Sequence, residues 1–444
     1  MTAVPAAGGK PINMTRVVLT ALAASSIEWY DFFIYGTAAA LVFPKLFFSH
    51  DLPPYVAQLA SFSTFAVGFI ARPIGGVVFG HFGDLIGRKK ALVTAMLIMG
   101  LATTAVGLLP SYERIGVAAP LILILLRFLQ GLAVGGQWGG AALLAIENAP
   151  AHKRGFFGSF AQMGVPAGVI SANLIFLIMG ATVAPEAFQA WAWRIPFLLS
   201  ILLVALSLYV QFALEDTAEF KALEKAEDKI EKKRTGSPIL TAIAKNPKGI
   251  LLAAGSFVAA NGTFYIMITY AVSYWTGTLH LPKNTILWAV MLGSVISAPV
   301  LPITAALSDK FGRRGIFLLG AGLELLWAVP FFLLINTGQF GPAVLALAGG
   351  LTFNSVMYGL QAAMMTEMFD TEFRYSGASL GYQIGAILGG GFAPTIAVAL
   401  YNHYNSAMAI SGYMAVLCAI SFLSVLILTE THKREDRVPA TAET

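Results

Sequence analysis

The chain has 444 residues, of which 57% are hydrophobic and only 11% are charged, and its formal net charge is +5. A soluble domain carries about 25% charged residues, so this composition requires lipid rather than water around much of the folded surface. The basic residues lie in short loops between apolar runs and not on one face, which argues against a nucleic-acid-binding protein.

Residue types that bind metals or form disulfides are sparse. Cys418 is the one cysteine and lies in an apolar stretch, so we expect it to pack in the interior. The six histidines are scattered, and no two have the spacing of metal ligands. A nucleotide motif is also missing. The sequence therefore predicts no metal, no cofactor and no enzyme activity, and it favours ion gradients as the energy source.

Twelve apolar segments are long enough to cross a bilayer as helices, which takes about 20 residues each. The first follows a Gly- and Pro-containing N-terminus, 1–16, and is interrupted by Glu28 and Asp31. Those charges are wrong for a cleaved signal peptide, so we expect a retained helix. The predicted spans are 17–43, 56–82, 91–109, 119–148, 155–183, 191–214, 248–279, 285–308, 315–337, 341–369, 378–400 and 406–429.

The two sets of six spans are separated by a stretch too rich in Glu, Lys and Asp to enter lipid, 215–247. Most Lys and Arg residues lie in the two termini, this connector and the loops on the same side. The other side has only Lys45, Arg114 and Lys283. The positive-inside rule therefore predicts an inner-membrane protein with a cytoplasmic connector and both termini, 1–16 and 431–444, in the cytoplasm. The predicted bundles are 17–214 and 248–430.

The two halves repeat in sequence. Gly80-His-Phe-Gly-Asp84-Leu-Ile-Gly-Arg88-Lys follows the second span, and Ala305-Ala-Leu-Ser-Asp309-Lys-Phe-Gly-Arg313-Arg follows the eighth. The two loops are 225 residues apart. Glu147 and Arg154 match Glu367 and Arg374 at a separation of 220 residues, and Gln162 matches Gln383 at 221. Tandem six-helix repeats place a solute site at their interface, near mid-membrane.

The repeated loop resembles the signature loop of the major facilitator superfamily, and Arg127-Phe-Leu-Gln130-Gly131 resembles its second motif. Further segments are similar to the metabolite:proton symporter family. They are Glu28-Trp-Tyr-Asp31-Phe-Phe-Ile-Tyr35-Gly, Trp193-Arg-Ile-Pro-Phe197 and Arg374-Tyr-Ser-Gly-Ala-Ser-Leu-Gly-Tyr-Gln383. One departure is Gln137, where the family often has Glu. If that Glu takes part in proton handling, this chain lacks it.

The resemblance implies an all-α membrane protein with twelve transmembrane helices in two pseudo-symmetric six-helix bundles. It also implies proton-coupled uptake of a small organic acid by alternating access. The alternative is proton symport of a zwitterion such as proline or betaine. Osmosensing members have a long coiled-coil tail, which the short heptad-free segment after Glu430 does not provide.

Asp31 and Glu28 are three residues apart and share a face of the first span with Tyr35. A carboxylate within a span costs several kcal/mol unless it is paired, hydrated or protonated. Burial favours the neutral form of the carboxyl, whereas a nearby cation favours its charged form. A carboxyl under both influences can therefore bind and release a proton. We expect Asp31, with Glu28 and Arg127, to couple transport to protons. The alternative is a fixed ion pair that holds the first span in place.

Three arginines lie within or at the edge of spans. Arg127 could pair with a carboxylate of the first span, anchor a substrate carboxylate, or extend toward the membrane interface. Arg72 precedes Pro73 deep in its span and is expected to be buried, whereas Arg194 starts the sixth span and could reach the interface.

Polar side chains within spans are expected to face the interior, where they contact substrate or hydrogen bond between helices. Glu324 is an unexplained acid in the ninth span, which is peripheral in the superfamily fold, so we expect no substrate role for it. The predicted substrate-binding residues are Tyr35, Arg72, Arg127, Gln130, Gln137, Trp138, Gln162, Asn261, Tyr265, Asn354, Tyr358, Gln361 and Gln383.

Charged residues at the cytoplasmic helix ends have a second predicted role. In the superfamily such charges form a network that holds the cytoplasmic side closed. The alternative is that they only set topology, but that rule involves mainly Lys and Arg and leaves the paired acids unexplained. The predicted gate is Asp84, Arg88, Glu147, Arg154, Asp309, Arg313, Glu367 and Arg374.

The sequence supports two other classes of function less well. A receptor or enzyme on this scaffold would need a nucleophile–base set or a metal cluster, and neither is present in the sequence. Drug antiport would fit a Gly-Pro motif in the fifth span, which Gly164-Val-Pro166-Ala-Gly168 matches only in part. The expected partners are a small, carboxylate-bearing solute, protons and the lipid bilayer, with no nucleic acid, and we expect a monomer.

Overall fold

The computed structural model describes residues 4–6, 9–12, 14–86, 88–147, 153–202, 204–205, 243–369 and 374–430. Within these ranges, side chains are described except at 4–21, 23–24, 80–89, 92, 136–147 and 374–375.

The first half is built of long helices joined by short ones. Its long helices are α1 (Met14–Leu41), α3 (Pro54–Ile86), α4 (Arg88–Leu108), α6 (Ala118–Glu147) and α8 (Gly164–Thr182), with α7 (Arg154–Gln162) leading into α8. The short ones are α2 (Phe43–Leu46), α5 (Tyr112–Ile115), α9 (Pro185–Ala190) and the 3-10 turn η2 (Ala192–Arg194), which opens an apolar helix over 192–202.

The second half contains α13 (Pro247–Tyr265), α15 (Lys283–Ser297), α16 (Val300–Phe311), α17 (Arg313–Ile335), α18 (Phe340–Glu367), α19 (Arg374–Ala386), α20 (Ala393–Tyr404) and α21 (Ala407–Ile427). α13 continues through π-helical η3 (Ile266–Tyr270), α14 (Ala271–Ser273) and η4 (Tyr274–Thr278). The π-helical η5 (Ile387–Gly391) joins α19 to α20. Such segments break the regular hydrogen-bond ladder and recur at functional sites.

Within the described ranges, nine helices are long and apolar enough to span a membrane. Shorter apolar helices over 93–108 and 192–202 coincide with the third and sixth predicted spans, and α1 coincides with the first. The chain is thus a multi-pass, almost wholly helical membrane protein. The N-terminus also has a small antiparallel pair, β1 (Val4–Ala6) and β2 (Gly9–Ile12), which the sequence did not predict because the segment has no alternating apolar pattern.

Glycines let α3 and α6 meet backbone to backbone. A Cβ added to Gly135 would overlap the carbonyl oxygen of Arg72, and one added to Gly131 would overlap that of Gly68. This is the packing that small residues at helical spacing allow in membranes. The contact fixes Arg72 of α3 and Arg127 of α6 on neighbouring helices.

We expect Gly135→Val to impair assembly of the first half. The side chain has no space against the Arg72 backbone, and overpacking of a close contact costs about 1–3 kcal/mol or more. The melting temperature of the purified protein in detergent should fall. Gly315→Val is the matched control, because nothing lies within 4 Å of a Cβ at that glycine of α17. Equal melting temperatures for both variants would contradict the close packing.

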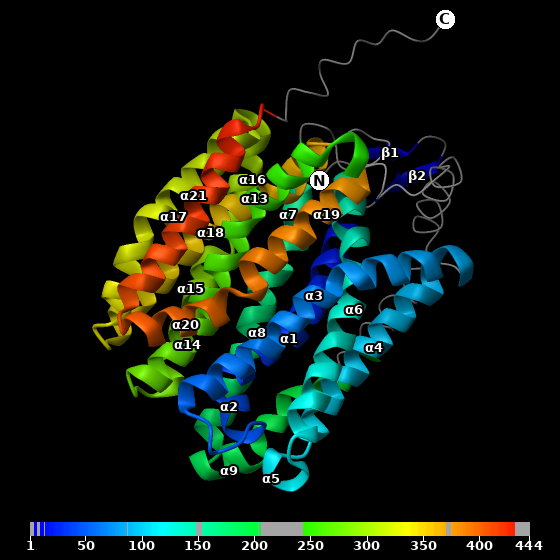
Figure 1. Cartoon of the computed structure of the whole chain (residues 1–444). Coiled ribbons are helices and arrows are strands. Elements are labelled where there is room, and N and C mark those ends of the chain that lie inside the picture. Colours follow the sequence, from blue (N-terminus) through cyan, green and yellow to red (C-terminus); the bar gives the residue numbers. More distant parts are fainter. Residues whose placement is uncertain are drawn as a thin grey trace, which may run out of the picture.

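The two halves lie side by side and touch at both ends (Figure 1). At the end that carries Asp309, predicted to be cytoplasmic, α7 packs against α16 and α18. Toward the other end α8 packs against α15, where Gly180 lies against the Asn284 side chain. α3 also contacts η5 and α20, and α1 contacts α14. The described helices of the two halves therefore contact each other toward both ends of the molecule.

Candidate functional site

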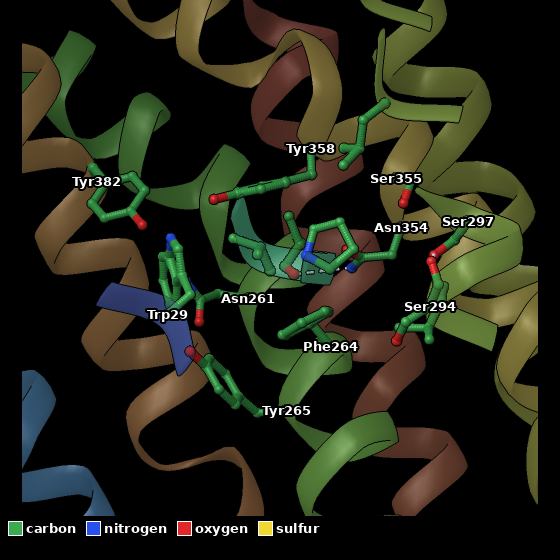
Figure 2. A pocket seen from close by; sticks show the side chains of 15 residues that line it. Trp29, Asn261, Phe264, Tyr265, Ser294, Ser297, Asn354, Ser355, Tyr358 and Tyr382 are labelled. Carbon is green, nitrogen blue, oxygen red and sulfur yellow. Dashed lines mark hydrogen bonds between the residues drawn. The ribbon is translucent and has the colours of Figure 1, made fainter. Parts of the chain in front are cut away.

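A small cavity lies where the two halves meet. Its wall comes mainly from α13, α15 and α18 of the second half, with Trp29 of α1 and two residues of α8 from the first. Figure 2 shows Trp29 and Tyr382 on one side and Ser294 and Ser297 on the other. The lining residues are Trp29, Val165, Pro166, Ala260, Asn261, Phe264, Tyr265, Ser294, Ser297, Leu301, Leu351, Asn354, Ser355, Tyr358 and Tyr382. An apolar wall with a few polar groups is typical of a small-molecule site.

The polar groups on the wall differ in how far the protein itself satisfies them. The Asn354 amide donates to the Ala260 carbonyl over 2.9 Å, and the Ser294 hydroxyl donates to its own helix. The hydroxyl groups of Tyr358 and Tyr382 are close enough to interact electrostatically. The Asn261 Oδ1, in contrast, has no hydrogen-bond partner among the described residues. It is the wall acceptor most available to a solute.

Two buried arginines lie beside this cavity, in the first half. Arg72 and Arg127 are each 1% exposed. The Arg72 guanidinium carbon is 4.6 Å from the centroid of the Phe32 ring, and that of Arg127 is 4.2 Å from the same centroid. Phe69 faces Arg72 at 4.5 Å, and Tyr35 faces Arg127 at 4.3 Å. Aromatic faces attract a desolvated cation electrostatically, so these rings partly offset the burial of the two charges.

The two guanidinium groups retain unused hydrogen-bond donors. Nε and Nη2 of both have no partner within the described part of the chain. Arg127 donates from Nη1 to the Gln130 amide oxygen over 3.2 Å, and Gln130 donates to the Thr103 hydroxyl. The Arg72 guanidinium is close enough to interact with the hydroxyl of Tyr265, which also lines the cavity. Tyr265 therefore connects a buried cation to the cavity wall.

The two acids of α1 have different neighbours. Asp31 is 2% exposed, and its Oδ1 accepts a hydrogen bond from the Ser200 hydroxyl over 2.5 Å. Its Oδ2 has no partner among the described residues, and no ion pair there joins it to an arginine. Glu28, by contrast, is close enough to interact with the Arg72 charge. Among the described residues, the acid–arginine interaction of α1 is therefore that of Glu28 with Arg72.

Of the predicted substrate-binding residues, Asn261, Tyr265, Asn354 and Tyr358 line the cavity. The others whose side chains are described lie elsewhere. Tyr35 hydrogen bonds to Thr64 over 2.7 Å, and Gln361 donates to the Ser256 carbonyl. Gln162 reaches across the halves to the Tyr358 carbonyl over 2.6 Å, and Gln383 is buried away from the wall. The side chains of Gln137 and Trp138 lie outside the described residues.

Sequence reasoning missed several wall residues. Trp29 and Tyr382 stand inside the quoted family segments, so their position in a motif was an available signal. Ser294 and Ser297 are three residues apart in a predicted span, before Pro299, and that helical spacing could have found them. Phe264 gave no signal, because an aromatic residue in an apolar span is unexceptional.

The predicted gate joins the two halves through Asp309. Its two carboxylate oxygens accept hydrogen bonds from the backbone N–H groups of Gly155 and Phe156, each over 2.9 Å, at the start of α7. A carboxylate is favoured there by the free N–H groups and the helix dipole.

Arg313 holds the Asp309 carboxylate in place. Its guanidinium is 2.7 Å from Asp309 and 3.0 Å from Glu367. Arg154 begins α7 beside this cluster. The side chains of Asp84, Arg88, Glu147 and Arg374 lie outside the described residues.

A sequence profile described as "Sugar (and other) transporter" matches residues 17–435 of this chain. The chain belongs to that family, within the major facilitator superfamily. Among curated relatives, the inner membrane metabolite transport protein YhjE of Escherichia coli is 41% identical over 95% of this chain and 96% of its own. The shikimate transporter of Escherichia coli is 37% identical over 94% and 95%. A glycine betaine/proline/ectoine/pipecolic acid transporter of Dickeya dadantii is 34% identical over 94% and 84%.

Solved structures agree with this assignment at the level of the fold. The xylose transporter XylE of Escherichia coli, in a partially occluded inward-open conformation, has a TM-score of 0.70 with 15% identity, covering 97% of this chain and 99% of its own. The chain therefore has the major facilitator fold, and its relatives are those of the metabolite:proton symporter family to which its motifs are similar. As a member of a transporter family, it is a small-molecule transporter and not an enzyme.

Proposed function

We propose that this chain is a secondary active symporter that takes up a small, carboxylate-bearing metabolite together with protons by alternating access. The observation that carries the proposal is the pair of buried arginines beside a cavity between the halves, with Tyr265 close to Arg72 and on the cavity wall. The bundles 17–214 and 248–430 would rock about this cavity as two bodies.

The charge of the solute follows from the unsatisfied donors. A buried cation is costly unless an anion or hydrogen-bond acceptors compensate it. Arg72 and Arg127 have aromatic faces but keep unpartnered N–H groups within the described residues. A carboxylate entering the cavity gains from both charges, and an arginine fork matches its two oxygens. The shikimate transporter, a relative at 37% identity, is named for a substrate of this chemical class.

Proton coupling is assigned to the acids of α1. Asp31 is buried with one oxygen unpartnered among the described residues, and Glu28 is close enough to interact with both Asp31 and the Arg72 charge. Arrival of an anion at Arg72 competes with Glu28 for that cation. Since a buried carboxylate without a countercharge takes up a proton, solute and proton enter together.

In the cell, we place the protein in the inner membrane as a monomer, with both termini and the connector 215–247 in the cytoplasm. The positive-inside distribution of Lys and Arg supports this orientation. The cluster around Asp309 then lies on the cytoplasmic side and would close that side of the pathway.

One observation favours a second candidate, a zwitterion with a quaternary ammonium group. Five aromatic residues line the cavity: Trp29, Phe264, Tyr265, Tyr358 and Tyr382. Aromatic rings bind such cations by their faces, and the relative from Dickeya dadantii is named for glycine betaine. In this case Arg72 would bind the carboxylate and the aromatic wall the ammonium.

A thermal-shift screen of the purified protein with shikimate, 2-oxoglutarate and glycine betaine separates the candidates. We expect the organic acids to stabilise the protein and Arg72→Gln to weaken their binding about tenfold to a hundredfold, because a charged hydrogen bond contributes about 1.5–3 kcal/mol. Lys283→Gln is the control, since it removes a cation at the far end of α15. Binding of glycine betaine with no response to any acid would replace the first candidate by the second.

A further inference from the structure

Glu324 is a buried acid that the proposed mechanism does not use. It stands in the middle of α17 and has no exposed surface. Its Oε1 is 2.5 Å from the Thr263 hydroxyl of α13 and 3.4 Å from the Asn354 amide nitrogen of α18. Its Oε2 has no hydrogen-bond partner among the described residues. The side chain thus points inward, although α17 is a peripheral helix.

No cation compensates this carboxyl among the described residues. The groups that face it from α13 and α18 are the neutral Thr263 and Asn354, and the titratable neighbour on α21 is the buried thiol of Cys418. α21 contains no charged residue.

The charged residues of the neighbouring helices are remote. Arg313 and Arg314 of α17 lie about 15 Å or more along the helix axis from Glu324, at 1.5 Å per residue, and Asp309 of α16 pairs with Arg313 at that same end. Lys248 of α13 and Glu367 of α18 are about 20 Å from Thr263 and Asn354 by the same measure. A lone carboxylate in such surroundings is costly, which favours the neutral acid.

The single hydrogen of the Thr263 hydroxyl also favours the neutral form of Glu324. The oxygen lies 2.8 Å from the Ala259 carbonyl and 2.5 Å from Glu324 Oε1, but the hydroxyl has only one hydrogen to donate. If Glu324 is protonated, its own O–H donates to Thr263, and Thr263 donates to Ala259. If Glu324 is ionised, the Thr263 hydroxyl turns to the carboxylate and releases Ala259. Gain or loss of one proton therefore reverses a hydrogen bond.

Asn354 carries this change to the cavity. Its amide has two hydrogens and three acceptors in reach: the Ala260 carbonyl at 2.9 Å, Thr263 Oγ1 at 3.2 Å and Glu324 Oε1 at 3.4 Å. An ionised Glu324 draws one amide hydrogen away from Thr263. Asn354 also lines the cavity, where Figure 2 shows it between α13 and α18. A solute that binds the Asn354 amide alters the same hydrogen bonds.

From this geometry we propose that Glu324 is a second proton-binding site, in the second half, coupled to the cavity through Thr263 and Asn354. The carboxylate takes up a proton from water while the cavity is open to the outside, and the carboxylic acid releases it to water while the cavity is open to the cytoplasm. The transport role rests on the proposed symport, but the exchange of the proton can be tested without any solute.

Infrared spectroscopy of the purified protein tests the exchange directly. The C=O stretch of a buried, protonated carboxyl should appear at low pH and fade between about pH 5 and pH 9. We expect Glu324→Gln to lose this band. Thr263→Val should keep the band but shift its frequency, since the acceptor of the O–H is gone, and it provides a second readout if Glu324→Gln is unstable. Glu113→Gln is the control, because that acid is exposed.

Uptake measurements then distinguish proton binding by Glu324 from its role in transport. In cells that accumulate shikimate or glycine betaine through this protein, Glu324→Gln should reduce accumulation about tenfold and weaken its dependence on external pH. A spectrum unchanged by Glu324→Gln, or a Glu324 band that does not titrate in the tested range, would overturn the proton site. A titrating band in a protein whose uptake ignores the proton gradient would instead refute symport and leave the proton site standing.

Discussion

Asp31→Asn should abolish uphill uptake of the solute that the binding screen identifies, reducing accumulation to that of cells without the transporter. Asparagine keeps the size of the side chain and can still accept the Ser200 hydrogen bond, but it cannot bind and release a proton. Exchange of internal for external solute needs no net proton movement. We therefore expect exchange to remain within a few-fold of the unmodified protein, and the comparison of uptake with exchange in vesicles is the measurement.

Two controls decide whether the charge or the packing of Asp31 matters. Ser200→Ala removes the hydrogen bond at Oδ1 but leaves the carboxyl, so it should retain proton-driven uptake. Glu28→Gln tests the neighbouring acid, which interacts with Arg72. Full proton-driven accumulation by Asp31→Asn would exclude Asp31 from coupling and leave Glu28 or Glu324 as the proton carrier.

The helices of this fold could be predicted well because each span must satisfy its own backbone in lipid and therefore appears as a long apolar run. The ninth span was predicted at 315–337, and α17 covers Arg313–Ile335. The π-helical segments η3, η4 and η5 could not be predicted. A π-helical turn is wider than an α-helical one, and η5 packs against α3 and α13, contacts that the local sequence does not reveal.

The candidate site could be predicted in part. Asn261, Tyr265, Asn354 and Tyr358 are polar residues in apolar spans, and the cost of exposing them to lipid points them inward, where the structure has them. The surroundings of Arg127 could not be predicted. Its aromatic neighbours come from two other helices, α1 and α3, and the sequence does not show which spans are adjacent.

Glu324 illustrates the same limit. Its helix is peripheral, so the sequence suggested no role near the solute. The side chain nevertheless extends from α17 toward α13, where the Thr263 hydroxyl meets it. Whether a polar residue faces lipid or the interior depends on helix rotation, and an almost uniformly apolar segment such as Arg313–Ile335 leaves that rotation undetermined.

Asp309→Asn should open the predicted cytoplasmic end of the protein. Asp309 accepts two backbone hydrogen bonds from the start of α7 and is held by Arg313, so one carboxylate joins the two halves. Asparagine offers a single acceptor oxygen and no charge. A loss of about 2 kcal/mol from charged hydrogen bonds corresponds to a shift of about thirtyfold toward inward-open forms. Expression and membrane insertion should be unchanged, because no Lys or Arg is altered.

Labelling of a cysteine on the cavity wall measures this opening. Ser355→Cys, in a Cys418→Ser background, places a thiol that a membrane-impermeant reagent reaches only when one end of the cavity is open. In inside-out vesicles Asp309→Asn should speed labelling by at least about tenfold. In right-side-out vesicles the same substitution should slow labelling, because a larger share of inward-open protein leaves a smaller share of outward-open protein. Asp51→Asn, at the opposite end, is the matched control. Equal rates for Asp309→Asn and the unmodified gate, in well-folded protein, would mean that Asp309 does not hold the halves together.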